Sequence, residues 1–456
     1  MRVTMERRHG KAGFVAVALG CFVACGSSGG TGAGGAGGGT GARGGTPGNG
    51  GSGGTSGGAG TAGTAGGGGG ADAGVCDHQL ASAACWASMG LTGLTSNMQQ
   101  IIGGAFDGRY LYLVNSVRGA PSLRHDTQAA SLSGGWSAFT TSTLKSGPSS
   151  FQGAAFDGRY VYFVPWGDLA VRYDSQASFN TGASWTSFNT GTLVPQPDGG
   201  IASNATSYFG AAFDGRYLYY VPARTLTGPA NSIVLRFDTQ AGFTTASSWS
   251  TFDASTIGSS VRDFAGAAFD GRYVYFVPRS NGQVLRCDTQ ATFTTAATWA
   301  TFDTTTLPTP ASSFEGAAFD GRYVYLAPNS TGILTRYDSQ GTFASAASWE
   351  TLDATMLGSS SFSRWYYSGA TFDGRYVYFV PNSGSLLRYD SQAPFGATTS
   401  WGVLDLQTVG LVDGAYRGAV FDGRYVYILP GGLIPLVRFD AQASPSLPPN
   451  SGASFF

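Results

Sequence analysis

Short apolar runs separated by the same polar residues recur along the chain from about residue 100 to residue 440. A run of the type Gly-Ala-Ala-Phe is followed by Asp-Gly-Arg and then by an alternating run of the type Tyr-Val-Tyr-Phe-Val-Pro. The segment occurs seven times, with its phenylalanine at Phe106, Phe156, Phe213, Phe269, Phe319, Phe372 and Phe421. The first and last of these are six repeats apart, which gives about 52 residues per repeat.

Each repeat predicts four short strands. Asp-Gly between two apolar runs indicates a tight hairpin, and we expect a type I′ turn with positive φ at both central residues. A proline ends the second strand, a segment of the type Leu-Arg-Tyr-Asp forms the third, and Ser-Trp-Thr-Ser-Phe forms the fourth. Four strands in a repeat of this length are typical of a propeller blade. The chain is therefore predicted to be an all-β, seven-bladed β-propeller with four antiparallel strands per blade.

The fourth-strand motif is displaced by one repeat. After the first repeat it occurs six times, at Trp136, Trp185, Trp249, Trp299, Trp349 and Trp401, and its seventh copy lies at the front, around Trp86. The last repeat ends after its third strand, at Asp440. We expect the strand around Trp86 to complete that blade and close the ring, which leaves no open sheet edge. Residues 75–456 are thus predicted to be one domain.

The N-terminal 25 residues have the character of an export signal. Arg2, Arg7, Arg8 and Lys11 precede an apolar stretch over residues 12–24 that is too short for a transmembrane helix. The stretch ends at Cys25 and resembles a bacterial lipoprotein signal, which implies lipidation of that cysteine. Cys21 is a second candidate, and an ordinary cleaved signal peptide is the alternative. The resemblance implies export to the outer membrane or cell surface through a lipid anchor, and secretion is the alternative.

Residues 26–74 follow as a low-complexity segment. Of these 49 residues 27 are glycine, and there is almost nothing apolar to offset the entropy of ordering. We expect a disordered tether. Over the whole chain, 26 basic residues face 27 acidic ones, and only 12% of residues are charged. This balance argues against a nucleic-acid binder.

The cysteines fit an exported protein. Cys76 and Cys85 flank a short loop before the repeats, and we expect a disulfide between them. Cys287 stands where other repeats have tyrosine, phenylalanine or histidine, and it is expected to be a buried apolar residue.

The order of the motifs resembles the kelch-type propeller family. That family has a glycine-led first strand, tyrosine in the second, Tyr-Asp in the third and tryptophan in the fourth. The likeness covers residues 85–445 but lacks the paired glycines that kelch repeats carry after the second strand. A copper site like that of kelch-type oxidases would need two histidine ligands, and the repeats and the segment before them contain only His78 and His125. We therefore expect no metal and no cofactor.

The repeated charged residues are interpreted as structural, because residues that every blade carries are best explained by what every blade needs. The residues that break the repeat are more informative. In propellers the strand 2–3 and strand 4–1 loops share one face, and here these loops vary in length and sequence. We call it the variable face, and the opposite end, with its repeated Asp-Gly turns, the uniform face. The position just before the expected innermost strand also differs in every blade: Ile102, Gln152, Phe209, Ala265, Glu315, Ser368 and Arg417. These residues are expected to surround the mouth of the central channel.

Aromatic and charged residues on the variable face suit a polar ligand such as a saccharide or a peptide. The candidate ligand-binding residues are Trp166, Arg262, Arg364, Trp365, Tyr366 and Arg417. The alternative is an unspecialised loop surface. Asp263 and Glu315 are the one pair of acids we nominate for a glycoside hydrolase or lyase. We expect instead a non-catalytic, monomeric surface protein that binds an extracellular saccharide or protein, with a purely structural surface protein as a further alternative.

Overall fold

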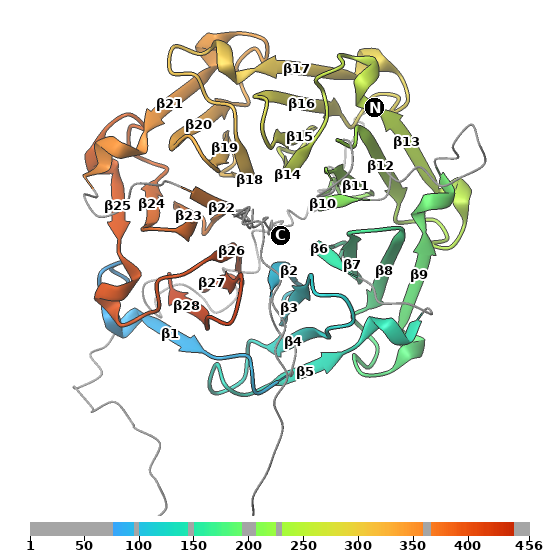
Figure 1. Cartoon of the computed structure of the whole chain (residues 1–456), viewed down its shortest axis with the longest axis horizontal. Coiled ribbons are helices and arrows are strands. Elements are labelled where there is room, and N and C mark those ends of the chain that lie inside the picture. Colours follow the sequence, from blue (N-terminus) through green and yellow to red (C-terminus); the bar gives the residue numbers. More distant parts are fainter. Residues whose placement is uncertain are drawn as a thin grey trace, which may run out of the picture. The chain divides into compact units, whose positions relative to one another are not determined.

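The computed structural model describes residues 76–94, 100–144, 150–193, 207–224, 230–358 and 366–441. These residues form seven four-stranded antiparallel sheets arranged in a ring (Figure 1). The predicted seven-bladed β-propeller is therefore confirmed. The predicted signal over residues 1–25, with Cys21 and Cys25, and the predicted tether over residues 26–74 lie outside the described residues. No helix in the described part of the chain is long and apolar enough to cross a membrane.

In blades 1–6 the strands follow the chain from the ring centre outward. Blade 1 contains β2 (Ile101–Phe106), β3 (Tyr110–Asn115), β4 (Ser122–Asp126) and β5 (Trp136–Phe139). Blade 2 contains β6 (Phe151–Phe156), β7 (Tyr160–Pro165), β8 (Leu169–Asp174) and β9 (Trp185–Asn189). Blade 3 contains β10 (Tyr208–Phe213), β11 (Tyr217–Pro222), β12 (Ile233–Asp238) and β13 (Trp249–Asp253). Blade 4 contains β14 (Phe264–Phe269), β15 (Tyr273–Pro278), β16 (Gln283–Asp288) and β17 (Trp299–Asp303).

The remaining blades repeat this plan. Blade 5 contains β18 (Phe314–Phe319), β19 (Tyr323–Pro328), β20 (Ile333–Asp338) and β21 (Trp349–Asp353). Blade 6 contains β22 (Tyr366–Phe372), β23 (Tyr376–Ser383), β24 (Leu386–Asp390) and β25 (Trp401–Leu404). Blade 7 contains β26 (Tyr416–Phe421), β27 (Tyr425–Pro430), β28 (Leu436–Asp440) and, from the front of the chain, β1 (Trp86–Met89).

Short 3₁₀ helices flank the fourth strands. Those before the strand are Ala83–Cys85, Gly182–Ser184, Ala246–Ser248, Ala296–Thr298, Ala346–Ser348 and Thr398–Ser400. Those after it are Thr141–Leu144, Thr190–Leu193, Ala254–Thr256, Thr304–Thr306, Ala354–Leu357 and Leu406–Val409.

The ring is closed by β1, as the displaced Trp86 motif predicts. β1 pairs with β28 in an antiparallel register that sets Trp86 opposite Phe439. The Trp86 indole donates to the carbonyl of Leu80 at 2.9 Å, six residues earlier. Trp249 makes the corresponding bond to Phe243 at 3.0 Å, also six residues earlier. The front of the chain thus reproduces a complete fourth-strand motif inside the last blade.

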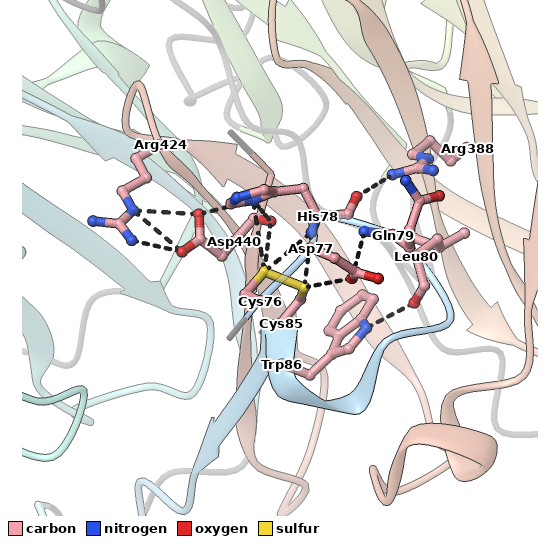
Figure 2. The surroundings of a disulfide bond; sticks show 10 residues. All are labelled: Cys76, Asp77, His78, Gln79, Leu80, Cys85, Trp86, Arg388, Arg424 and Asp440. Atoms are coloured by element: carbon pink, nitrogen blue, oxygen red, sulfur yellow. Dashed lines mark hydrogen bonds and ion pairs between the residues drawn. A yellow bond between two sulfur atoms is a disulfide. The ribbon is translucent and has the colours of Figure 1, made fainter. Parts of the chain in front are cut away.

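A disulfide and a set of polar contacts hold this junction together. Figure 2 shows the predicted Cys76–Cys85 disulfide, which is present, beside His78 and Asp440. The His78 ring nitrogen Nδ1 lies 3.1 Å from the carbonyl oxygen of Asp440 and 3.6 Å from its carboxylate. Arg388 of blade 6 donates to the backbone carbonyl of His78 at 3.3 Å. The segment before β1 is therefore tied to two blades at once.

The hairpin turns differ from the expected type. The first and second strands are joined at Asp-Gly as predicted, but among the described residues only His78 and Asp263 are non-glycine positions with positive φ. In blade 2 Gly158 has φ 102°, while Asp157 and Tyr160 close the turn. A single positive φ at the first central residue is the pattern of a type II′ turn. The type I′ prediction was wrong because the aspartate precedes the two loop residues.

The core is divided among the interfaces between neighbouring blades. A representative cluster joins Ala155 and Tyr162 of blade 2 to Tyr208 and Phe237 of blade 3, all of them fully buried. In five blades the fourth-strand tryptophan packs on a tyrosine or phenylalanine of its own third strand, as Trp249 does on Phe237 with 4.7 Å between ring centroids. The blades are therefore buried on both faces.

Two blades depart from the aromatic third-strand position. Cys287 is 1% exposed, and burial raises the pKa of its thiol to about 12, which leaves it protonated and inert. The prediction of a buried apolar cysteine is confirmed. His125 occupies the same position in blade 1, where it stacks on Trp136 at 4.6 Å. His125 is also 1% exposed.

His125 is expected to make the stability of the propeller depend on pH. Burial, aided by the positive charge of Arg438, lowers the pKa of His125 below its ordinary value. Below about pH 6.5 the unfolded chain takes up a proton that the folded protein resists, so stability is lost as pH falls. We predict that the melting temperature of the wild type drops more between pH 7.5 and pH 5 than that of His125→Phe. Identical pH profiles would contradict this assignment.

Candidate binding site at the channel mouth

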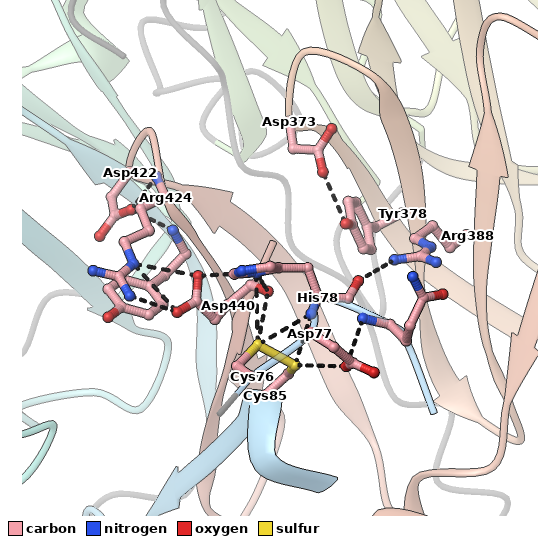
Figure 3. Close-up of polar contacts among 12 residues, drawn as sticks. Cys76, Asp77, His78, Cys85, Asp373, Tyr378, Arg388, Asp422, Arg424 and Asp440 are labelled. Atoms are coloured by element: carbon pink, nitrogen blue, oxygen red, sulfur yellow. Dashed lines mark hydrogen bonds and ion pairs between the residues drawn. A yellow bond between two sulfur atoms is a disulfide. The ribbon is translucent and has the colours of Figure 1, made fainter. Parts of the chain in front are cut away.

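On the uniform face, the repeated turn aspartate accepts hydrogen bonds from its own blade, and the repeated turn arginine pairs with the aspartate that ends the third strand. Figure 3 shows Asp373, whose Oδ2 accepts the Tyr378 hydroxyl at 2.8 Å; its Oδ1 accepts the N–H groups of Arg375 and Tyr376. The turn arginine pairs in each blade with the aspartate that ends the third strand, as Arg424 does with Asp440 at 2.7 Å. These residues are occupied in holding the blades, which supports their interpretation as structural.

The third-strand arginines are structural as well. Arg172 of blade 2 lies over the ring of Tyr160 in its own blade at 4.1 Å and over that of Phe243 in blade 3 at 4.9 Å. Arg286 makes the equivalent pair of contacts with Tyr273 and Phe343. Each of these guanidinium groups is sandwiched between aromatic rings of neighbouring blades.

The residues predicted to surround the channel mouth occupy one equivalent position in all seven blades. We call Ile102, Gln152, Phe209, Ala265, Glu315, Ser368 and Arg417 the axial ring. They lie inside the first strands and not just before them, because the strand continues past a break in its pairing. In each first strand the axial residue and the following glycine lie where the register with the second strand shifts. All seven are buried, with exposures of 4% or less. The apolar members, Ile102, Phe209 and Ala265, belong to none of the inter-blade core clusters. The first strands stand nearest the centre of the ring (Figure 1), and we infer that this position faces the central axis.

A second set of residues sits beside the axial ring, directly after each second-strand proline or its equivalent. We call Ser116, Trp166, Ala223, Arg279, Asn329, Asn382 and Gly431 the rim ring. In six blades the rim N–H donates, at 2.7–3.0 Å, to the carbonyl two residues before the axial residue. Two blades show direct contact between the rings: the Arg417 side chain packs against Gly431, and Glu315 accepts a hydrogen bond from the Asn329 side chain. The two rings therefore lie side by side in one layer toward the variable face.

Aromatic and cationic groups meet in this layer across three blades. The Trp166 ring of blade 2 contacts the edge of Phe209 in blade 3, with 6.2 Å between centroids. The guanidinium of Arg279 in blade 4 lies 5.9 Å from the same Phe209 ring. The sequence indicated Trp166 but gave no reason to join it to Phe209 and Arg279, because their pairing depends on the spatial order of the blades.

The other candidate ligand-binding residues have different environments. Arg262 is exposed on the variable face, and Tyr366 is half-buried at the start of β22. Arg417 is 1% exposed and is the largest of the fully buried side chains. Arg364 and Trp365 lie outside the described residues.

The two candidate acids both have partners. Asp263, at φ 62°, is 6% exposed, and its Oδ1 accepts the N–H of Arg224 in the preceding blade at 3.0 Å. This contact ties a loop of blade 4 to one of blade 3. Glu315 is 1% exposed and accepts a hydrogen bond from the Asn329 side chain beside it. The assignment of this pair to hydrolysis stays a prediction.

Within the described part of the chain, one group of possible metal ligands is found, and it lies at the ring closure. Cys76, His78 and Asp440 bring a sulfur, a nitrogen and a carboxylate oxygen within 4.8 Å of one another. The Cys76 sulfur is bonded to Cys85, so it offers no thiolate to a metal. The histidine acts here as a contact between the two ends of the ring.

Comparison with known proteins identifies the fold. No family model and no curated protein sequence matches the chain. Among solved structures, the chain is similar to one described as YCF48 bound to D1 peptide, with a TM-score of 0.50 and 14% sequence identity. The match covers 78% of this chain and 97% of that one. At this identity the likeness establishes the propeller fold alone, and the kelch-type resemblance is not confirmed.

Proposed function

We propose that this chain is a non-catalytic binding propeller that holds a segment of a protein partner on its variable face. The observation that carries the proposal is the contrast between the two faces. The uniform face repeats the same ion pairs and turns in all blades, whereas the axial and rim rings carry a different residue pair in each blade. Loops and channel mouths of rigid scaffolds are where binding residues concentrate. The solved neighbour is described with a bound peptide, which favours a peptide over a saccharide.

The proposal is tested by crosslinking from each face of the full-length protein. A photoreactive amino acid replaces Arg262, exposed on the variable face, and in a second version Gln340, exposed on the uniform face. After irradiation in cells or envelope extracts, we expect a discrete crosslinked protein from position 262 and none from position 340. Equal crosslinking from both positions, or none from either, would contradict the proposal. Recognition of a glycan on an array, abolished in Trp166→Ala, would replace the protein ligand by a saccharide.

We also infer that the propeller is exported and anchored by lipid at Cys25. The signal-like residues 1–25 support this, as does a disulfide of the kind found in oxidising compartments. Labelling with a fatty-acid analogue should be incorporated by the wild type and lost in Cys25→Ser. Retained labelling would move the modification to Cys21.

A further inference from the structure

Arg417 is a buried positive charge without a counter-charge. Its side chain is 1% exposed, it makes no ion pair among the described residues, and its Nη1 has no hydrogen-bond partner there. The buried third-strand arginine Arg336 offers a contrast, because it is paired with Glu350 at 2.9 Å and donates to Tyr389. A charge removed from water is costly unless an opposite charge or hydrogen bonds replace the solvent. The guanidinium of Arg417 thus lacks the counter-charge and hydrogen bonds that would offset its removal from water.

The guanidinium of Arg417 lies at the variable end of the channel. β26 begins at that end, because it runs from the strand 4–1 loop toward the Asp-Gly turn of the uniform face. The side chain then crosses Gly431 of the rim ring, where an added Cβ would lie 2.7 Å from Arg417 Nε and closer still to its Cγ. An added Cβ at Gly431 would also lie 2.5 Å from the carbonyl oxygen of Ala415, so this position has room only for glycine beside the arginine.

Two other members of the axial ring have unmet hydrogen-bonding groups. Gln152 Oε1 and Ser368 Oγ are buried and have no partner among the described residues. Both residues stand at the same register position in their blades as Arg417 does in blade 7. Ser368 belongs to the blade next to Arg417, and Gln152 lies two blades away on the other side. Glu315, the acidic member of the ring, is separated from Arg417 by blade 6 and accepts from Asn329.

We propose that the channel mouth binds a carboxylate group of the ligand, paired with Arg417 and bordered by Ser368 and Gln152. A carboxylate matches the planar fork of the guanidinium with two parallel hydrogen bonds. The Gln152 oxygen then accepts from an N–H or O–H that the ligand carries near this carboxylate. The proposal deepens the proposed function, since the group would be an acidic side chain or the C-terminus of the bound segment.

The test uses a carboxylate alone, so that it needs no partner protein. The full-length protein is melted in increasing sodium acetate against sodium chloride of equal ionic strength, with sodium phosphate as a third series. At a tenfold excess over the dissociation constant, we expect acetate to raise the melting temperature by about 2 °C over chloride. Saturation transfer to the acetate methyl group in NMR reports binding directly. Stabilisation by phosphate alone would overturn the assignment to a carboxylate.

Two variants separate binding from packing. Arg417→Met fills the same space without charge, and it should abolish both acetate effects and melt above the wild type in chloride, because an uncompensated buried charge has been removed. Arg118→Met removes an exposed arginine from the same face and should keep the acetate response. A destabilised Arg417→Met, together with no acetate effect on the wild type, would show that Arg417 only packs. The two proposals can fail separately. Absence of an acetate effect would not affect a protein partner found by crosslinking, and absence of a crosslink would not affect a carboxylate site found with acetate.

Discussion

Removal of residues 26–91 should lower the melting temperature by about 10 °C or more and make the protein prone to aggregate. The deletion takes away β1 and with it the four residue pairs that join it to β28. It also removes Leu80 and Cys85 from the core cluster between blades 6 and 7. β28 then becomes an unprotected edge, which is a template for pairing with other chains.

The matched control is removal of residues 26–74, which leaves β1 and the disulfide in place. Both deletions keep the signal region and Cys25, and they differ only in the segment that closes the ring. We expect the shorter deletion to melt as the wild type does, measured by circular dichroism and light scattering. If the longer deletion also melted like the wild type, ring closure by β1 would contribute nothing to stability.

Gly316→Ala should destabilise the propeller by about 2–5 kcal/mol. Gly316 has φ 92°, where an L-residue is strained, and an added Cβ would lie 2.6 Å from the Cα of Gly369 in the next blade. The strain costs about 1–2 kcal/mol, and forcing the two first strands apart adds about 1–3 kcal/mol. The measurement is the free energy of unfolding in urea.

Gly410→Ala separates these two contributions. Gly410 has φ 77°, but an added Cβ would meet nothing within 4 Å. We expect this variant to show the backbone strain alone and to remain about 1–3 kcal/mol more stable than Gly316→Ala. Equal losses in the two variants would mean that the close approach of Gly316 to Gly369 is of no consequence.

The sequence predicts the architecture well because the motifs of one blade occur seven times in the chain. Strand positions, blade number and the closing role of Trp86 all follow from comparing the chain with itself. The turn type did not follow, since the dipeptide Asp-Gly does not reveal which of its residues lies in the loop. The reason for Gly316 could not be predicted either, because it is the approach of Gly369 from the next blade.

The site was predicted only in outline. Periodicity set the axial ring apart from the repeated arginines, and its place around a channel mouth stays a prediction. It could not show that Arg417 is buried without a partner, because that depends on the space above Gly431. The contacts of His78 with Asp440 were missed for a similar reason: 362 residues separate the two, and no repeat connects them.

The position of β1 has a consequence for the order of events during synthesis. A chain made from its N-terminus produces β1 first, yet the strand that pairs with it, β28, ends at Asp440. β1 must therefore wait for the six intervening blades before it acquires its partner. The Cys76–Cys85 disulfide needs only residues 76–85, so it can form before β28 is synthesised. It then constrains the loop that precedes β1. The pairing of β1 with β28 is therefore the last to form, and it is the one that closes the ring. Until then, the incomplete chain is an open array of blades whose two terminal blades are exposed.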